Sequence, residues 1–133
     1  MTGPSLRDPS PFDALLGTEW LDDHPDHARV RAAVRDDLRQ PIGLVHGGVL
    51  SSLVESVCSR AAARAVFDQG MAAMGQSISV SFVRPVTEGT IQVDARVRHR
   101  GRTTWVWEAE VTDGEGRLCA IAQMTTAVRP LPG

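Results

Sequence analysis

The sequence predicts a single α+β domain in which one long helix lies between an early strand and a group of later antiparallel strands. Three observations lead to this fold class. Residues 48–67 repeat apolar side chains every three or four positions, which is typical of a helix that packs on one face. The segments on either side alternate apolar and polar residues, which is typical of half-buried strands. The chain has 133 residues, enough for one hydrophobic core and too few for two.

The strands follow in chain order from the same alternation. Residues 12–21 fit either a short helix or a strand, and the sequence leaves both open. Residues 28–34 alternate alanine and valine with arginine and predict the first clear strand, and residues 36–45 predict the loop that leads into the helix. Four strand patterns and no second helix follow: residues 77–82, 91–98, 105–111 and 117–128.

Matching of faces predicts how the second and third of these later strands are joined. A three-residue loop, 101–103, sets Val97 beside Trp107, so that apolar residues face each other. A two-residue turn would instead oppose Arg98 to Trp105 and mix the faces. We therefore expect the three-residue loop, with both tryptophans in the core.

Three arginines, Arg96, Arg98 and Arg100, follow each other at every second position and are expected to share one face of the strand. A solvated row is the favoured interpretation of such a pattern. Binding of adenosine phosphates is the alternative, because the guanidinium fork matches phosphate oxygens.

The run from Gln40 to Gly48 leads directly into the predicted helix and carries the most chemical information. Its last two residues, Gly47 and Gly48, let the backbone approach a ligand closely, and the first N–H groups of a helix have no partner within the helix. A carbonyl oxygen that gains negative charge would be stabilised there. Glu55 lies eight residues beyond Gly47, about 12 Å along a helix. The spacing therefore favours acyl transfer over phosphate binding.

The helix face around Glu55 carries serines at positions 51, 52, 56 and 59, where a solvent-facing helix would usually carry charged side chains. Small side chains permit close approach. We therefore expect either a second subunit or a ligand on this face.

Composition excludes several classes of function. The net charge of −2 and the pI near 6.0 give no reason to expect nucleic acid or an anionic membrane as a partner. All 14 basic residues are arginine, which excludes Schiff-base chemistry by lysine. Cys58 and Cys119 have neither CxxC nor metal-ligand spacing, so we expect no metal site and no disulfide scaffold. Without a signal peptide or an apolar stretch of 18 residues, we expect a cytoplasmic protein.

The pattern Gln40-x-x-Gly43-x-x-His46-Gly47-Gly48, the helix with Glu55 and the four later strands resemble the hotdog-fold acyl-CoA thioesterases. The branch of the 4-hydroxybenzoyl-CoA and phenylacetate-degradation thioesterases is the most similar. The resemblance runs from about residue 15 to residue 129, which predicts a flexible N-terminus at 1–14 and one hotdog domain at 15–133.

This resemblance implies an antiparallel sheet wrapped around the helix and hydrolysis of an acyl-CoA, with an aromatic acyl group as one option. Coenzyme A is then part of the substrate, and no further cofactor is expected. In similar proteins two chains pair into a continuous sheet with the active sites at the dimer interface, and dimers often pair into tetramers.

The resemblance also implies roles for individual residues. The Gly47 N–H polarises the thioester carbonyl, and Glu55 acts either as the nucleophile or as a general base on water. Gln40 lies near the carbonyl and the hydrolytic water, and Ser59 hydrogen-bonds water or substrate. The expected contacts to coenzyme A are Gly48, Arg84, Arg102 and Thr103.

His46 and the reaction class each leave alternatives. A buried, hydrogen-bonded His46 that shapes the loop is favoured over a catalytic role in proton transfer. A non-hydrolytic acyl-CoA binding module could use the same scaffold. A hydratase or dehydratase of enoyl or hydroxyacyl thioesters would typically use a histidine and an aspartate, which His46 and Glu55 match only loosely.

Overall fold

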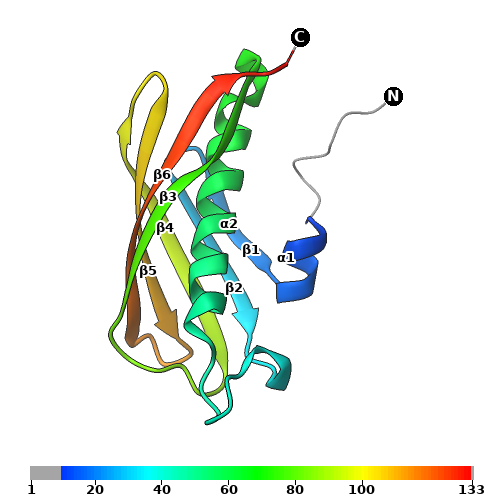
Figure 1. Cartoon of the computed structure of the whole chain (residues 1–133), viewed down its shortest axis with the longest axis vertical. Helices are drawn as coiled ribbons and strands as arrows, with labels where there is room; N and C mark the ends of the chain where they lie inside the picture. Colours follow the sequence, from blue (N-terminus) through cyan, green and yellow to red (C-terminus); the bar gives the residue numbers. More distant parts are fainter. Residues whose placement is uncertain (1–9, 133) are drawn as a thin grey trace.

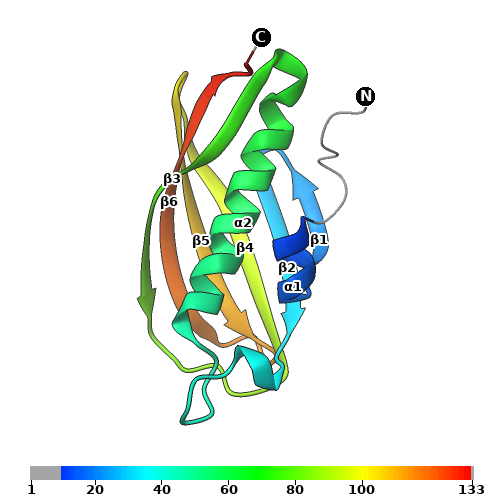
Figure 2. The ribbon, with the colours of Figure 1, turned by 45° about the vertical axis from the view of Figure 1, so that its right-hand side comes forward.

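The computed structural model describes residues 10–132, in which a six-stranded antiparallel sheet wraps around one long helix (Figures 1 and 2). The strand order is β1-β2-β4-β5-β6-β3, so β1 and β3 form the two edges. This confirms the expected α+β fold class and the hotdog arrangement. The elements are α1 (Pro11–Leu16), β1 (Glu19–His24), β2 (His27–Ala33), η1 (Asp36–Leu38), α2 (Gly47–Val66), η2 (Phe67–Gln69), β3 (Met71–Phe82), β4 (Thr90–Arg100), β5 (Thr104–Asp113) and β6 (Leu118–Pro130).

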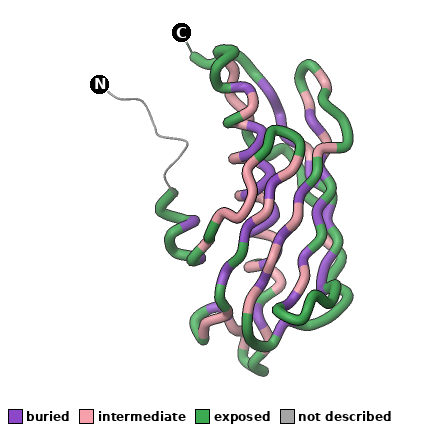
Figure 3. The backbone as a smooth tube through the Cα atoms, turned by 180° about the vertical axis from the view of Figure 1, so that it is seen from behind, coloured by how far each residue is buried: buried purple, intermediate pink, exposed green. Residues whose placement is uncertain are grey.

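Helix α2 supplies the centre of the hydrophobic core. The predicted apolar stripe is buried along its length, which confirms the face assigned from the periodicity; its members are Leu50, Leu53, Val54, Val57 and Ala61. Buried and more exposed residues alternate along β4 and β5, as the molecule seen from behind illustrates (Figure 3). The sheet therefore buries one face on α2 and leaves the other open to solvent.

A β-bulge divides strand β3 into two parts. The register against β6 shifts between Gly75 and Ser77, so Gln76 is the extra residue. Gly75, before the bulge, faces α2 and lies beside Glu55 and Ser59. Phe82, after the bulge, also faces α2 and lies against Gly47. The predicted alternation of apolar and serine residues after the bulge is thus preserved, with Ser77 bonded to Thr125 on the other face.

The pairing of β4 with β5 confirms the predicted register over most of its length, since Val97 pairs with Trp107. Nearer the turn, a second bulge with Arg98 as the extra residue shifts the register by one, so Arg100 pairs with Trp105. Residues 101–103 lie between the two strands, as predicted, but the predicted pairing of the residues next to this loop is wrong. Both tryptophans are buried, as expected.

The same bulge changes the predicted arginine row. The guanidinium of Arg100 lies 4.6 Å from the centre of the Trp105 ring and forms an ion pair with Asp26. Arg100 therefore does not share a face with Arg96. A cation over an indole face is a favourable contact that a continuous ladder would not have allowed.

Residues 12–21, for which helix and strand were both open, contain one of each. Helix α1 begins at Pro11, where the Ser10 hydroxyl accepts a hydrogen bond from the Asp13 N–H, and ends at Gly17 in the left-handed conformation. Strand β1 follows directly.

Helix α1 packs against α2, and the contact is made by a buried carboxylate of α1; Figures 1 and 2 show where the two helices lie. Asp13 is 2% exposed, accepts a hydrogen bond from the Ser56 hydroxyl and lies 3.8 Å from a guanidinium nitrogen of Arg60. The predicted flexible segment 1–14 thus differs from the structure at its last residues, which are helical and packed. Its residues 1–9 lie outside the described part of the chain.

Candidate functional site

The start of α2 lines an open pocket of about 510 Å³ that contains three of the predicted site residues. Gln40 comes from the preceding loop, Gly47 is the first residue of the helix, and Arg84 follows β3. The rest of the lining is mainly apolar and includes Phe82 and Leu50. The pocket thus combines an apolar wall with a helix N-terminus and a cation, which suits a ligand with both apolar and anionic parts.

The ring of Phe82 lies directly against Gly47. A Cβ atom at position 47 would lie 2.8 Å from Cζ of the phenyl ring, closer than carbon atoms pack. The bare backbone lets the ring rest on the helix start. Gly48, by contrast, has no atom within 4 Å of a Cβ position and is exposed, so a ligand can reach it.

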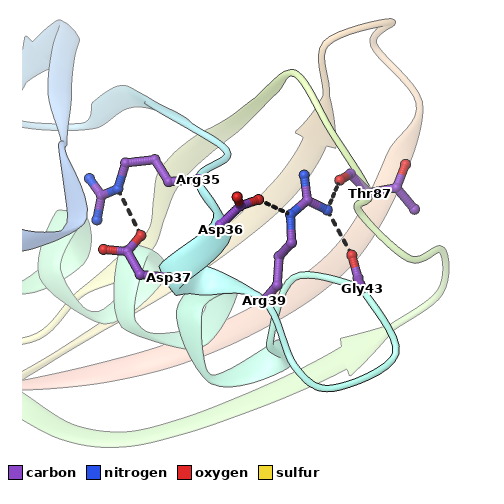
Figure 4. A network of polar contacts seen from close by, with 6 residues as sticks. All are labelled: Arg35, Asp36, Asp37, Arg39, Gly43 and Thr87. Carbon is purple, nitrogen blue, oxygen red and sulfur yellow. Dashed lines mark hydrogen bonds and ion pairs between the residues drawn. The ribbon is translucent and has the colours of Figure 1, made fainter.

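The loop that carries Gln40 is braced by Arg39 (Figure 4). Its guanidinium donates to the Asp36 carboxylate at 3.2 Å, to the Gly43 carbonyl at 2.7 Å and to the Thr87 carbonyl. The last of these bonds ties the loop to the segment that precedes β4. One side chain therefore joins both ends of the loop to a neighbouring part of the fold.

Gln40 has one end of its side chain already engaged. Its Oε1 accepts a hydrogen bond from the Ile42 N–H at 2.6 Å, and its backbone N–H donates to the Leu44 carbonyl at 2.7 Å. The side-chain NH₂ group is therefore the part of Gln40 that can donate to a ligand or a water.

His46 is exposed, so the expectation of a buried histidine is wrong. It is the N-cap residue of α2, and its side chain makes no capping bond. Its backbone shapes the helix start instead, because its N–H donates to the Leu38 carbonyl and its carbonyl accepts from the Val49 N–H, both at 3.0 Å. The loop is thus shaped by the main chain of His46 rather than by its imidazole.

Glu55 and Ser59 form a second cluster on the same helix. The Ser59 hydroxyl donates to Oε1 of Glu55 at 3.2 Å, and both side chains are partly buried. Cys58 lies beside them, and burial together with the charge of Glu55 raises the pKa of its thiol well above the ordinary value. Cys58 is therefore a core residue and not a nucleophile.

The serine-rich face is occupied in three different ways. Ser56 bonds to Asp13, so α1 covers this part of the helix rather than a ligand. Ser51 and Ser52 donate to the carbonyls one turn earlier, at 3.2 and 2.7 Å. Ser59 donates a hydrogen bond to Glu55. Helix α1 of the same chain thus covers part of the face on which a second subunit or a ligand was expected.

The remaining predicted residues, Arg102 and Thr103, lie at the opposite end of α2. Arg102 lines a separate pocket of about 440 Å³ with Val66 and Gln69, beyond the helix C-terminus. The Thr103 carbonyl accepts from the N–H of Val128 at 2.8 Å. Arg84 and the Arg102–Thr103 turn are therefore not brought together within one chain.

A larger pocket, of about 640 Å³, lies on the outer face of the sheet. It contains none of the residues predicted for the thioester site, although Arg96 and Arg98, the alternative candidates for adenosine phosphates, line it. It is lined by serines of β3 and by charged residues of β4 and β5 of both signs, among them Arg96 and Glu108. Because it lies away from α2 and from Glu55, we do not assign it to the reaction.

Strand β3 offers an edge for a partner. Within the described residues it pairs only with β6, and it runs over 12 residues. Exposed apolar side chains lie along it and just after it: Met74, Ile78, Phe82 and Val83. A long apolar edge of this kind is expected to pair with another chain.

Sequence reasoning missed Gly75. A Cβ atom at this position would lie 3.1 Å from Oε1 of Glu55 and 3.4 Å from Oγ of Ser59, so β3 passes directly over the second cluster. The signal was present, because an isolated glycine within a strand pattern indicates a bulge or a close approach of the backbone.

Comparison with known proteins gives a consistent result. The sequence model of the thioesterase superfamily matches residues 42–120. A Mycobacterium tuberculosis protein named as an esterase is 35% identical over 116 residues, which are 86% of this chain and 83% of that protein. The proofreading thioesterase EntH of Cronobacter turicensis is 33% identical over 113 residues, which are 85% of this chain and 82% of EntH.

Solved structures agree with the sequence comparison. The crystal structure of a Haemophilus influenzae thioesterase has a TM-score of 0.85 and 28% identity, and the match covers 92% of this chain and 85% of that one. Among the described helices, none has the length and apolar character needed to cross a membrane.

Proposed function

Because the chain belongs to the thioesterase superfamily and is a thioester hydrolase, we propose that its substrate is an acyl-CoA and that Glu55 and Gly47 carry out the hydrolysis. The observation that supports this most is the helix α2 itself. Its first amide lines a pocket with Gln40 and Arg84, and a carboxylate held by Ser59 lies two turns further along.

The reaction would use two chains. Gly47 and Glu55 are eight residues apart on one helix, about 12 Å, so they cannot both touch the same thioester carbonyl. Antiparallel pairing of two β3 edges would place the two α2 helices side by side in opposite directions. Glu55 of one chain would then approach Gly47 of the second copy. The exposed apolar edge of β3 supports this homodimer, and the dimer could pair again into a tetramer.

In this site each group has a distinct task. The Gly47 N–H would stabilise the oxyanion that forms on the thioester carbonyl, and one such donor contributes about 2.7–4 kcal/mol in a measured protease case. The ionised Glu55 would attack the carbonyl carbon or remove a proton from water. The NH₂ group of Gln40 and the Ser59 hydroxyl would hold that water.

Coenzyme A would be bound across the two chains. Arg84 of one chain and the Arg102–Thr103 turn of the other would hold its phosphates and pantetheine, since guanidinium groups bind phosphate oxygens strongly. Gly48 is open to the same ligand. The reaction requires no cofactor beyond the coenzyme A of the substrate, and its products are the free acid and the thiol. A cytoplasmic location, where acyl-CoA is formed, fits this proposal.

No observation supports the hydratase alternative. His46 is exposed and lies nine residues before Glu55, about 13 Å along α2. Its imidazole is not held by a capping bond. In the proposed dimer His46 would come near Glu55 of the second copy, but no described contact orients its imidazole toward an acyl chain.

Thiol release from a panel of aromatic and aliphatic acyl-CoA thioesters tests the proposal. Glu55→Gln and Glu55→Ala should each lower kcat by about two orders of magnitude or more while substrate binding persists. Glu110→Gln is the matched control, because Glu110 is an exposed carboxylate on the outer face of the sheet. Wild-type rates in both Glu55 variants, or binding of acyl-CoA without thiol release by the wild type, would contradict the mechanism.

A further inference from the structure

Gly75 lies where strand β3 crosses the carboxylate of Glu55. A Cβ atom at this position would lie 2.7 Å from Cε of Met124, 3.1 Å from Oε1 of Glu55 and 3.4 Å from Oγ of Ser59. Each of these distances is at or below ordinary van der Waals contact. A side chain would fit only if these side-chain ends moved, and the strand meets the carboxylate with bare backbone.

The backbone conformation does not explain this glycine. Gly75 is not among the glycines with a positive φ angle, which are Gly17, Gly43, Gly70, Gly89 and Gly116. Any residue could adopt the extended conformation of β3 at this point. Ala73, the preceding residue on the same face of the strand, shows that a methyl group is accepted one step earlier. The space beside Glu55 is therefore what excludes a side chain.

The bulge that follows Gly75 strengthens the assignment. The register shift between Gly75 and Ser77 breaks the ladder to β6 next to the carboxylate and nowhere else on this strand. Bulges are over-represented next to active sites, because they redirect the strand locally. Glycine and bulge together set how closely β3 approaches α2 at Glu55.

The two closest neighbours of Gly75 are ends of flexible side chains. Met124 is 2% exposed and can move its terminal methyl group, and the Glu55 carboxylate can rotate. An added methyl group would therefore displace these ends and leave the backbone in place. We therefore expect the variant to fold, with the Glu55 carboxylate displaced.

We propose that Gly75 is a positioning residue for Glu55, which by its missing side chain determines where the carboxylate lies relative to the thioester. This inference rests on the proposed hydrolysis and adds to it a residue on a different element. A displacement of about 1 Å from the productive geometry can cost roughly 100-fold in rate. Gly75→Ala should accordingly lower kcat about 10- to 100-fold and leave KM within about threefold, since the methyl group alters the reacting group and not the coenzyme A contacts.

The test compares Gly75→Ala with Ser79→Thr, which adds one methyl group to the exposed outer face of the same strand. The control should keep wild-type kcat. Sedimentation and thermal unfolding of both variants establish the state of assembly and the stability. Loss of assembly in Gly75→Ala, in parallel with loss of rate, would overturn the inference and assign the glycine to the interface.

A second variant isolates the contact with the carboxylate. Glu55→Asp is one methylene shorter and withdraws the carboxylate from β3, so Gly75→Ala should cost no more than about twofold in kcat in this background. An equal loss in both backgrounds would show that the methyl group acts elsewhere and would overturn the inference.

A crystal structure of Gly75→Ala decides the point without an assay. The inference requires that Oε1 of Glu55 is displaced and that its hydrogen bond with Ser59 is altered. An unmoved carboxylate overturns it. Wild-type protein that releases no thiol from any acyl-CoA would remove the proposed function alone, and the crystal structure would still decide the placement of the carboxylate.

Discussion

Arg39 holds the loop that carries Gln40, and its removal tests whether that loop positions the site. The guanidinium makes two bonds to carbonyls, of Gly43 and Thr87, and one to the carboxylate of Asp36 (Figure 4). The Arg39 side chain is 27% exposed, whereas that of Asp36 is fully exposed. The ion pair with Asp36 is therefore a surface contact, and the carbonyl bonds carry the anchoring.

The cost of the change can be worked out from these contacts. A hydrogen bond contributes about 1 kcal/mol net, so Arg39→Ala should lower the free energy of unfolding by about 2 kcal/mol for its two carbonyl bonds. For a domain of this size that corresponds to about 7 °C in Tm. Asp36→Ala removes only the surface ion pair and should cost less than about 1 kcal/mol.

The same loss should appear in the kinetics. Without Arg39, part of the binding energy of the substrate would be used to order the loop. If that part is about 1.4 kcal/mol, kcat/KM falls tenfold. Circular dichroism during heating and thiol release from an acyl-CoA measure the two effects on the same preparations. An Arg39→Ala protein that unfolds like Asp36→Ala and keeps its full kcat/KM would refute the role of the loop.

Two further predictions concern the edge of the sheet and the turn between β5 and β6. Ile78→Asp, on β3, should weaken the proposed dimer more than about 100-fold in sedimentation and abolish thiol release, because the interface would have to bury an unpaired charge. Gln123→Asp, on the outer face of the sheet, is the control. An Ile78→Asp protein that is still dimeric and active would contradict the two-chain site. The pKa of Asp113 is lowered from its ordinary value, first by the hydrogen bond from the Arg117 N–H and then by the Glu115 N–H and the Arg117 side chain. A lowered pKa in the folded state stabilises the fold above the ordinary carboxyl pKa, and the contribution is lost as the pH falls through the folded value. Asp113→Asn should therefore unfold at lower urea than the wild type at pH 7, and the difference should shrink as the pH falls below the ordinary carboxyl pKa. A difference that does not change with pH would show that the turn does not depend on the charge.

The elements that could be predicted from the sequence are those whose signal is local. The apolar stripe of α2, from Leu50 to Ala61, and the alternation after the β3 bulge each lie within one element, and burial fixes the face in each case. The spacing of Gly47 and Glu55 could be evaluated in the same way, since helix geometry converts it directly into a distance.

The bulge at Arg98 could not be predicted, because it depends on a contact made across the sheet. The bulge at Gln76 had a local signal in Gly75, but the sequence does not show that Glu55 is what Gly75 approaches. The bulge at Arg98 places the guanidinium of Arg100 against the Trp105 ring. The bulge at Gln76 follows directly on Gly75, which lies beside Glu55. The Trp105 ring lies across the hairpin from Arg100, and Glu55 lies on another element, 20 residues before Gly75. Hydrophobic alternation specifies which face a strand buries but not where one residue is left over.

The N-terminal segment stayed undecided for a related reason. A helix as short as α1 is not stable alone, so its sequence carries only a weak preference. Its position is determined by the Asp13 carboxylate, which is buried against Ser56 and Arg60 of α2. A residue 43 positions away thus decides the structure of a six-residue helix.

Strand β3 connects the parts of the site that the sequence shows separately. Its first half places bare backbone against Glu55, and its last residue, Phe82, rests on Gly47 at the helix start. Its outer edge has no strand partner among the described residues. A second chain that pairs along this edge would therefore bring its own α2 to both clusters at once. Because neither cluster can reach a thioester bound at the other, the proposed pairing along β3 would complete the sheet and the proposed catalytic site in the same event.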